Sequence, residues 1–148
     1  PQLFSTTGFD IVGILARVAK RPNPTVFIGP VDFSCAFLVA DATVDDAPIL
    51  YASPALAKMT GYSVDEFLNR SCRFLQWPDG GRTRESHRDN TGARNELRNA
   101  ITTFTECQVK VTNYRKNGEM FPNLLTIVPI PDGDDWDIIR YWVGFQVD

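Results

Sequence analysis

The segment of this 148-residue chain with the clearest chemistry is residues 69–76, which read NRSCRFLQ. It places the thiol of Cys72 beside the cation of Arg73, within otherwise apolar sequence. A hydrolytic cysteine needs a general base and a group that orients that base. The sole histidine, His87, lies in a charged loop and is a poor candidate, so we do not expect an enzyme. A thiol that reacts only with a light-excited chromophore needs no such base.

Amide side chains near the end of the chain indicate a ligand-binding face. Asn117-Gly118 marks a hairpin, and the length of its loop decides which side chains share a face. A two-residue loop would place Asn113 and Asn123 on opposite faces. A three-residue loop, residues 116–118 with Gly118 at positive φ, places both on one apolar face. We expect the three-residue loop, because it gathers the apolar residues Val109, Val111, Phe121, Leu125 and Ile127 on that same face.

Two buried asparagines suit a flat heteroaromatic edge, such as a flavin pyrimidine or a nucleobase, because an amide both donates and accepts. On the last strand Gln146 adds a third amide, and Gly144 leaves room for a planar ligand. Alternatively, these amides bond one another, nearby backbone or buried water. Three arginines could bind a phosphate tail, although each taken singly fits a solvated surface better; they are Arg73, Arg94 and Arg98.

Composition narrows the function classes. A net charge of −3 and a pI near 5.1 disfavour a nucleic-acid surface. No apolar run approaches the roughly 20 residues of a membrane helix. Three widely spaced cysteines fit neither a disulfide framework nor a zinc site, and favour an intracellular setting. Of these, Cys35 and Cys107 are expected to be inert core residues.

The elements that must position these residues form an α+β pattern. Hydrophobic periodicity predicts a helix over residues 9–19 and strands over 33–40 and 49–51. Two short helices follow within residues 53–68, and a longer helix covers 91–103. Three strands, about 105–115, 119–130 and 138–147, close the chain. We expect one domain with an antiparallel sheet and helices on one face.

A family resemblance covers almost the whole chain. Successive motifs resemble those of LOV domains, the flavin-binding blue-light sensors of the PAS superfamily: residues 60–62 (TGY), 72–76 (CRFLQ), 97–101 (LRNAI), 113–118 (NYRKNG), 123–126 (NLLT) and 144–146 (GFQ). Residues 8–32 are similar to the N-terminal cap of fungal LOV photoreceptors of the Vivid, Envoy and White Collar-1 type. The long loop after Gln76 also resembles that group, in which it accommodates the adenine end of FAD.

The resemblance implies a PAS/LOV fold, with a five-stranded antiparallel sheet, short helices on one face and a helix-containing N-terminal cap. Residues 1–32 would be the cap and 33–148 the flavin-binding core. Cys72 would form a reversible adduct with flavin C4a, and Gln146 would reorient at flavin N5 and O4. The cofactor would be FAD, with FMN possible. The other flavin-contacting positions would be Asn113, Asn123, Arg73, Gln76, Arg98, Thr60, Leu38, Ile49, Leu125 and Phe121.

By the same resemblance, adduct formation would release the cap and promote a homodimer, or a heterodimer with another LOV or PAS protein. The outcome would be regulation of light-responsive transcription in the cytoplasm or nucleus. Ser71 departs from the family pattern, which has asparagine there, and this bears on adduct lifetime. The alternative is a PAS-type ligand-binding or interaction module without photochemistry.

Overall fold

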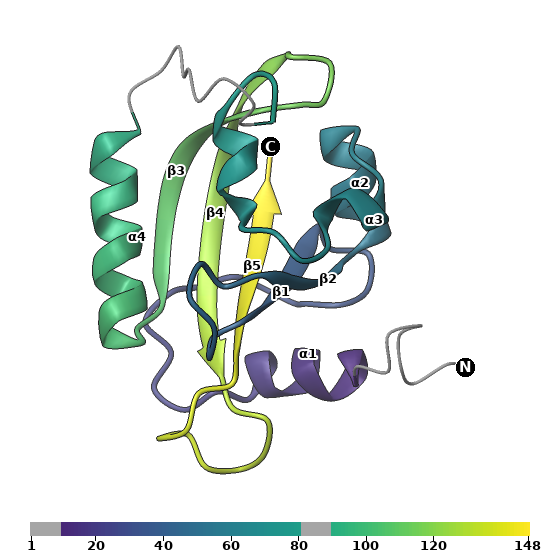
Figure 1. The fold of residues 1–148 in the computed structure, drawn as a ribbon. Helices are drawn as coiled ribbons and strands as arrows, with labels where there is room; N and C mark the ends of the chain where they lie inside the picture. The colour runs from purple at the N-terminus through teal and green to yellow at the C-terminus, as the bar shows by residue number, and fades with distance from the viewer. Residues whose placement is uncertain (1–9, 81–89) are drawn as a thin grey trace.

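A computed structural model describes residues 10–80 and 90–148, and in these residues five strands form one antiparallel sheet (Figure 1). The strands are β1 Phe37–Asp41, β2 Ile49–Ala52, β3 Cys107–Tyr114, β4 Met120–Ile130 and β5 Tyr141–Val147, in the order β2-β1-β5-β4-β3. The helices are α1 Ile11–Ala19, α2 Pro54–Thr60, α3 Val64–Phe67, α4 Thr91–Thr103 and the 3-10 helix η1 Cys72–Gln76. This is the predicted fold class.

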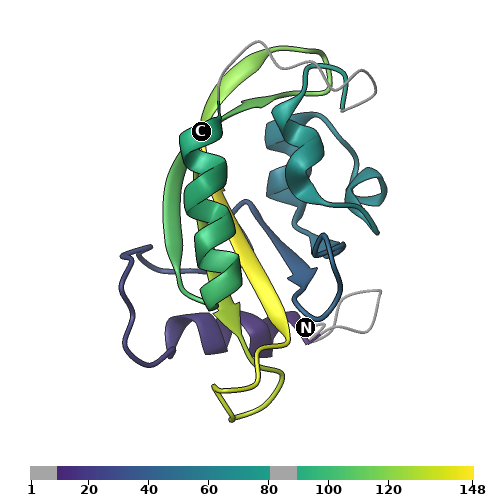
Figure 2. The same cartoon turned by 60° about the vertical axis from the view of Figure 1, so that its left-hand side comes forward.

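Each face of the sheet has its own hydrophobic core, because successive strand residues point to opposite faces. On the face that we call inner, Leu38 and Trp142 pack with residues of α2, α3, η1 and α4. On the outer face, Val39 and Val143 pack beneath α1. Four apolar side chains of α1 are buried there: Ile11, Ile14, Leu15 and Val18. Figure 2 shows α1 crossing one end of the sheet, away from η1 and α2.

The β3–β4 hairpin has the predicted three-residue loop. Val111 pairs with Asn123, and the Arg115 N–H donates to Glu119 O at 2.8 Å, which leaves residues 116–118 as the loop. Gly118 has φ +88°, a conformation that glycine adopts without steric cost. Both asparagines therefore lie on the inner face.

Three helices begin at a residue type that commonly caps a helix N-terminus, aspartate or serine. Asp10 accepts a hydrogen bond from the Gly13 N–H at 2.9 Å, and Ser53 accepts one from Leu56 N–H at 3.2 Å. Ser63 and Glu66 form a reciprocal capping box at α3. These side chains satisfy backbone donors that have no partner within the helix.

The first strand is shorter than predicted, because it begins at Phe37 and not at residue 33. Asp32 accepts a hydrogen bond from the Ser34 N–H at 2.8 Å, and the Cys35 N–H donates to Asp32 O at 3.2 Å. An aspartate that bonds backbone two residues on makes a turn that competes with strand pairing. Hydrophobicity alone did not reveal this turn.

The side chain of Asn90 completes the exposed edge of β3. Its amide donates to Thr112 O and accepts from the Thr112 N–H, both at 3.0 Å. Asn90 is buried, although it directly precedes α4. One side chain thus takes the place of a neighbouring strand at Thr112.

Candidate functional site

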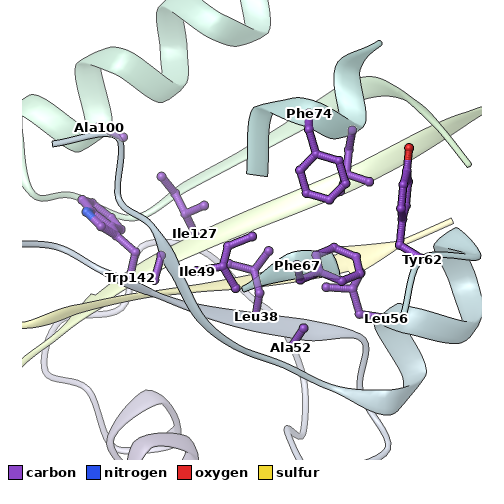
Figure 3. Packing of buried hydrophobic residues seen from close by; sticks show 12 residues of the cluster. Leu38, Ile49, Ala52, Leu56, Tyr62, Phe67, Phe74, Ala100, Ile127 and Trp142 are labelled. Carbon is purple, nitrogen blue, oxygen red and sulfur yellow. The ribbon is translucent and has the colours of Figure 1, made fainter. Parts of the chain in front are cut away.

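The cysteine of the signature segment begins η1, at the border of the inner core. Ser71 caps this helix by accepting from the Arg73 N–H at 3.3 Å. Phe74 anchors it through edge-on contacts with Tyr62 and Phe67, at ring-centroid distances of 5.0 and 5.4 Å. Figure 3 shows these rings in the inner core. The thiol of Cys72 is therefore held on a short, well-packed helix.

The environment of Cys72 keeps its thiol protonated at neutral pH. The side chain is partly buried and packs against the inner core. Burial raises the pKa of the Cys72 thiol, and this outweighs the Arg73 cation and a backbone hydrogen bond, which lower it. A thiolate nucleophile needs the opposite shift. The site therefore favours chemistry in which the thiol keeps its proton until its partner is activated.

Three buried amides form one connected network on the inner face of β3, β4 and β5. Asn123 Nδ2 donates to Asn113 Oδ1 at 2.8 Å and to Gln146 Oε1 at 2.9 Å. Asn113 Nδ2 also reaches Thr112 O at 3.2 Å, and Gln146 Nε2 reaches Gly144 O at 3.1 Å. The predicted hairpin register placed Asn113 and Asn123 on one face, and this is confirmed. The alternative, in which the amides bond one another and nearby backbone, describes the hydrogen bonds that the structure shows.

Gln76 has an unsatisfied acceptor that fits a polar ligand. It closes η1 with 6% of its surface exposed, and its Oε1 has no hydrogen-bond partner. A buried polar atom without a partner is unusual and costs about 1–3 kcal/mol. In the described residues the other such atom is the hydroxyl oxygen of Tyr114, whose side chain alternates with that of Asn113 along β3. Hydroxyls such as those of a flavin's ribityl chain would satisfy Gln76.

Gly144 lies beside two residues predicted to contact the flavin. A methyl group at Gly144 would meet Leu38 Cδ1 and Gln146 Nε2 at 3.5 Å, so the glycine lies against two residues of the predicted site. Leu38 on β1 and Ile49 on β2 are buried among the inner-core residues labelled in Figure 3. The residues present therefore fit a flavin. Three amides lie together on the inner face of the sheet, and apolar side chains lie beside them. The thiol of Cys72 borders the same core.

Other predicted positions divide between the inner face and the surface. Phe121 is buried, and Leu125 packs against the inner core. Thr60 is fully buried, and its hydroxyl donates to Leu56 O at 2.9 Å, which makes it part of the end of α2.

Of the three arginines considered for a phosphate, Arg94 is partly exposed on α4, and the two that the family resemblance assigns to the flavin lie at the surface. Arg73 pairs with Asp46 and donates to Ser71 Oγ at 3.1 Å, while Arg98 is exposed on α4. The loop residue His87 lies outside the described residues. In the part of the chain that is described, no cluster of three metal-ligating side chains occurs, and no helix is long and apolar enough to cross a membrane.

The fold and site define a PAS domain, and a family profile for the PAS domain matches residues 34–148. The chain belongs to this family, in its branch of fungal LOV blue-light photoreceptors. It is 46% identical to the blue light receptor lreA of Aspergillus flavus and 45% identical to the white collar 1 protein of Neurospora crassa, in each case over 99% of the chain. It spans 17% and 13% of the lengths of these two relatives.

Solved structures agree with this assignment. The photo-excited blue-light photoreceptor Vivid superposes with a TM-score of 0.86 at 45% identity, over 99% of this chain and 100% of the Vivid chain. The light-state dimer of Vivid gives a TM-score of 0.87 at 45% identity, over 100% of both chains. The similarity to these photoreceptors therefore also covers the described residues that precede the match to the PAS family, including α1.

Sequence reasoning missed one polar contact of the N-terminal segment. Arg21 and Glu106, which are 85 positions apart, form an ion pair with side chains only 9% and 10% exposed. No local motif marks such a pair, because its partners meet only after α1 and β3 are in place. The sequence offered one indication of this contact, the charged residue Glu106 directly before the strand that begins at Cys107.

Proposed function

We propose that this chain is a blue-light-sensing LOV domain that holds a flavin at the inner face of its sheet. The observation that carries the proposal is the unsatisfied Gln76 acceptor, in a fold where a buried amide network and a protonated thiol border the same inner core. When bound, the flavin supplies absorption of blue light and an electrophilic carbon, C4a, for the thiol of Cys72. The product is a reversible sulfur–carbon bond.

Each residue has a task in this function. Asn113 and Asn123 exchange their mutual hydrogen bond for bonds to the pyrimidine edge of the cofactor. Gln76 accepts from a ribityl hydroxyl. Cys72 would hold its proton in darkness, and when its sulfur bonds to the excited flavin the proton would pass to flavin N5. Gln146 would rotate its amide in response to that proton. This rotation would change its hydrogen bonds to Asn123 on β4 and to Gly144 on β5.

We assign FAD as the cofactor, with FMN as the competing candidate, on the strength of the long segment between η1 and α4. Arg73 and Arg98 are assigned to its phosphates, which requires Arg73 to leave Asp46. Release of α1 from the outer face then exposes a surface for a homodimer, or for a heterodimer with another LOV or PAS protein. A light-state dimer of the related Vivid supports this step. The resulting role is control of light-responsive transcription. We place the protein itself in the cytoplasm, the nucleus or both.

Absorption spectroscopy of the purified protein tests the proposal. Blue light should bleach the flavin absorption, darkness should restore it, and extraction of the cofactor should identify FAD. Cys72→Ala should retain the flavin and lose the reversible bleaching, whereas Cys107→Ala, which changes another partly buried thiol at the inner core, should bleach normally. Unchanged bleaching in Cys72→Ala would refute the assignment of the thiol. A colourless protein that takes up no flavin would favour the alternative, a PAS interaction module without photochemistry.

A further inference from the structure

The N-terminal segment is attached to the rest of the protein in two chemically different ways. Helix α1 packs on the outer face through a buried apolar stripe, Ile11, Ile14, Leu15 and Val18. The strap that follows, which we define as residues 21–28, is bound by the carboxylate of Glu106. Figure 1 shows the strap passing the ends of α4 and β3, where Glu106 lies between the two elements. These two attachments respond differently to force or to a conformational change.

Glu106 binds the strap with directional hydrogen bonds. Its Oε2 accepts from the backbone N–H groups of Thr25 and Val26, each at 3.0 Å, and its Oε1 accepts from Arg21 Nε. Burial alone would raise the pKa of Glu106, but the bonds from Arg21, Thr25 and Val26 prevail and lower it. The carboxylate is therefore charged at neutral pH, and charge-assisted hydrogen bonds are the stronger kind.

Arg21 closes the other side of the strap. Its guanidinium donates to Val26 O at 2.6 Å and to Val18 O, in the last turn of α1, at 2.8 Å. Pro22 and Pro24 fix two φ angles between these contacts, which reduces the conformational freedom of the strap. The arginine thus joins the end of α1 to a strap that is already shaped for Glu106.

The position of Glu106 in the sheet makes it a fixed point. The residue directly after it, Cys107, is the first of eight residues of β3 that pair without interruption along β4. Releasing the strap would leave a carboxylate and a guanidinium without their partners, with part of each side chain still buried. Releasing α1 would expose its buried apolar side chains, which a second protein surface can cover again.

We propose that Glu106 is the permanent anchor of the N-terminal cap, so that α1 moves in the lit state while the strap stays bound to β3. This inference rests on the proposed function for the light-driven release of α1. Among the described residues, the motion is confined to α1 and the residues up to Lys20, and the end of α1 at Val18 is the pivot. The anchor therefore limits how far the released helix travels and keeps it close to the outer face.

Amide hydrogen exchange of the flavin-loaded protein, in darkness and under blue light, tests the anchor. In the wild type, light should speed exchange of α1 amides and leave those of Thr25 and Val26 unchanged. In darkness, Glu106→Gln should speed exchange of Thr25 and Val26 about tenfold or more, because the charge that holds them is lost. Glu119→Gln, which removes an exposed ion pair with Arg115, is the matched control and should leave both amides as in the wild type.

The outcomes separate the anchor from the photoreceptor function. Unchanged exchange of Thr25 and Val26 in Glu106→Gln overturns the anchor, and so does light-induced loss of their protection in the wild type. If light does not change the exchange of α1 amides in the wild type, the proposed light-driven release of α1 is overturned. The comparison of Glu106→Gln with the wild type in darkness then tests the anchor by itself. Should Glu106→Gln not fold by circular dichroism, Arg21→Lys takes its place: it retains the carboxylate but loses the bridge to Val18 and Val26, so α1 should exchange faster.

Discussion

At the scale of single residues, the hydroxyl oxygen of Ser71 caps the short helix that carries Cys72. The family pattern has asparagine at this position, and both residue types are good helix N-caps. Ser71 Oγ accepts from Arg73 N–H at 3.3 Å and from Arg73 Nε at 3.1 Å, so one oxygen fixes both the start of η1 and the direction of the arginine. Asn69, two positions earlier, has φ +63°, a conformation that asparagine tolerates better than most residues. The substitution therefore preserves the cap.

Removing this oxygen should weaken the helix that carries Cys72. We expect Ser71→Ala to lower the free energy of unfolding by about 1 kcal/mol, the usual effect of losing an N-cap. Ser71→Thr keeps a hydroxyl and should retain most of that stability. Urea denaturation of the three proteins measures the difference. Equal midpoints for Ser71→Ala and the wild type would show that the oxygen contributes nothing to the cap.

At the scale of elements, the β3–β4 hairpin decides whether the amides can act together. A change of one residue in its loop would turn Asn113 or Asn123 to the outer face. The loop keeps its length through Gly118, whose φ of +88° lies in a region that side chains with a Cβ rarely adopt. The register of the hairpin, and with it the shared face of Asn113 and Asn123, depends on this one backbone conformation.

Gly118→Ala should therefore destabilise the protein by about 1 kcal/mol, because alanine is strained at positive φ. Gly133→Ala is the matched control: a methyl group there meets no atom within 4 Å, and a surface change of this kind stays within about 0.5 kcal/mol. Thermal or urea unfolding compares the two variants. An equal effect from both substitutions would argue against strain at Gly118.

Local patterns predicted most elements, and contacts between distant segments account for what they missed. The capping box at Ser63 and the hairpin at Gly118 are short-range signals, and both are present. The turn at Asp32 also is local, but the apolar run that follows concealed it. The hydrogen bonds among the amides were one of two alternatives that the strand pattern allowed, whereas the Arg21–Glu106 pair forms only when the strap meets the start of β3, so no local pattern marks it. Whether the site residues hold a flavin stays a prediction.

At the scale of the whole molecule, the attachment of the cap should fail in acid. Because the folded-state pKa of Glu106 lies below its ordinary value of 4.5, its stabilising effect is present above that value. The effect declines as pH falls below about 4.5 and is lost once the pH passes the folded-state pKa.

This direction of the pH dependence is checked by measuring the free energies of unfolding of the wild type and Glu106→Gln from pH 7 to pH 3. Their difference should be constant at the upper end and shrink in acid. Other carboxylates with lowered pKa values, Asp41 and Glu66 among them, titrate in both proteins and cancel in the difference. A gap that widens as the pH falls would contradict the assignment.

The side chain of Asn90 has a consequence for how this molecule meets copies of itself. An open edge strand is a template for strand addition, which can lead from ordered pairing to fibrils. At Thr112 the outward N–H and C=O groups of β3 are already taken by one amide. A protein built to associate on a signal, as Vivid does in its light-state dimer, gains from having that edge closed. Asn90 thus removes one pair of backbone groups from the edge at which strand addition to another copy would begin.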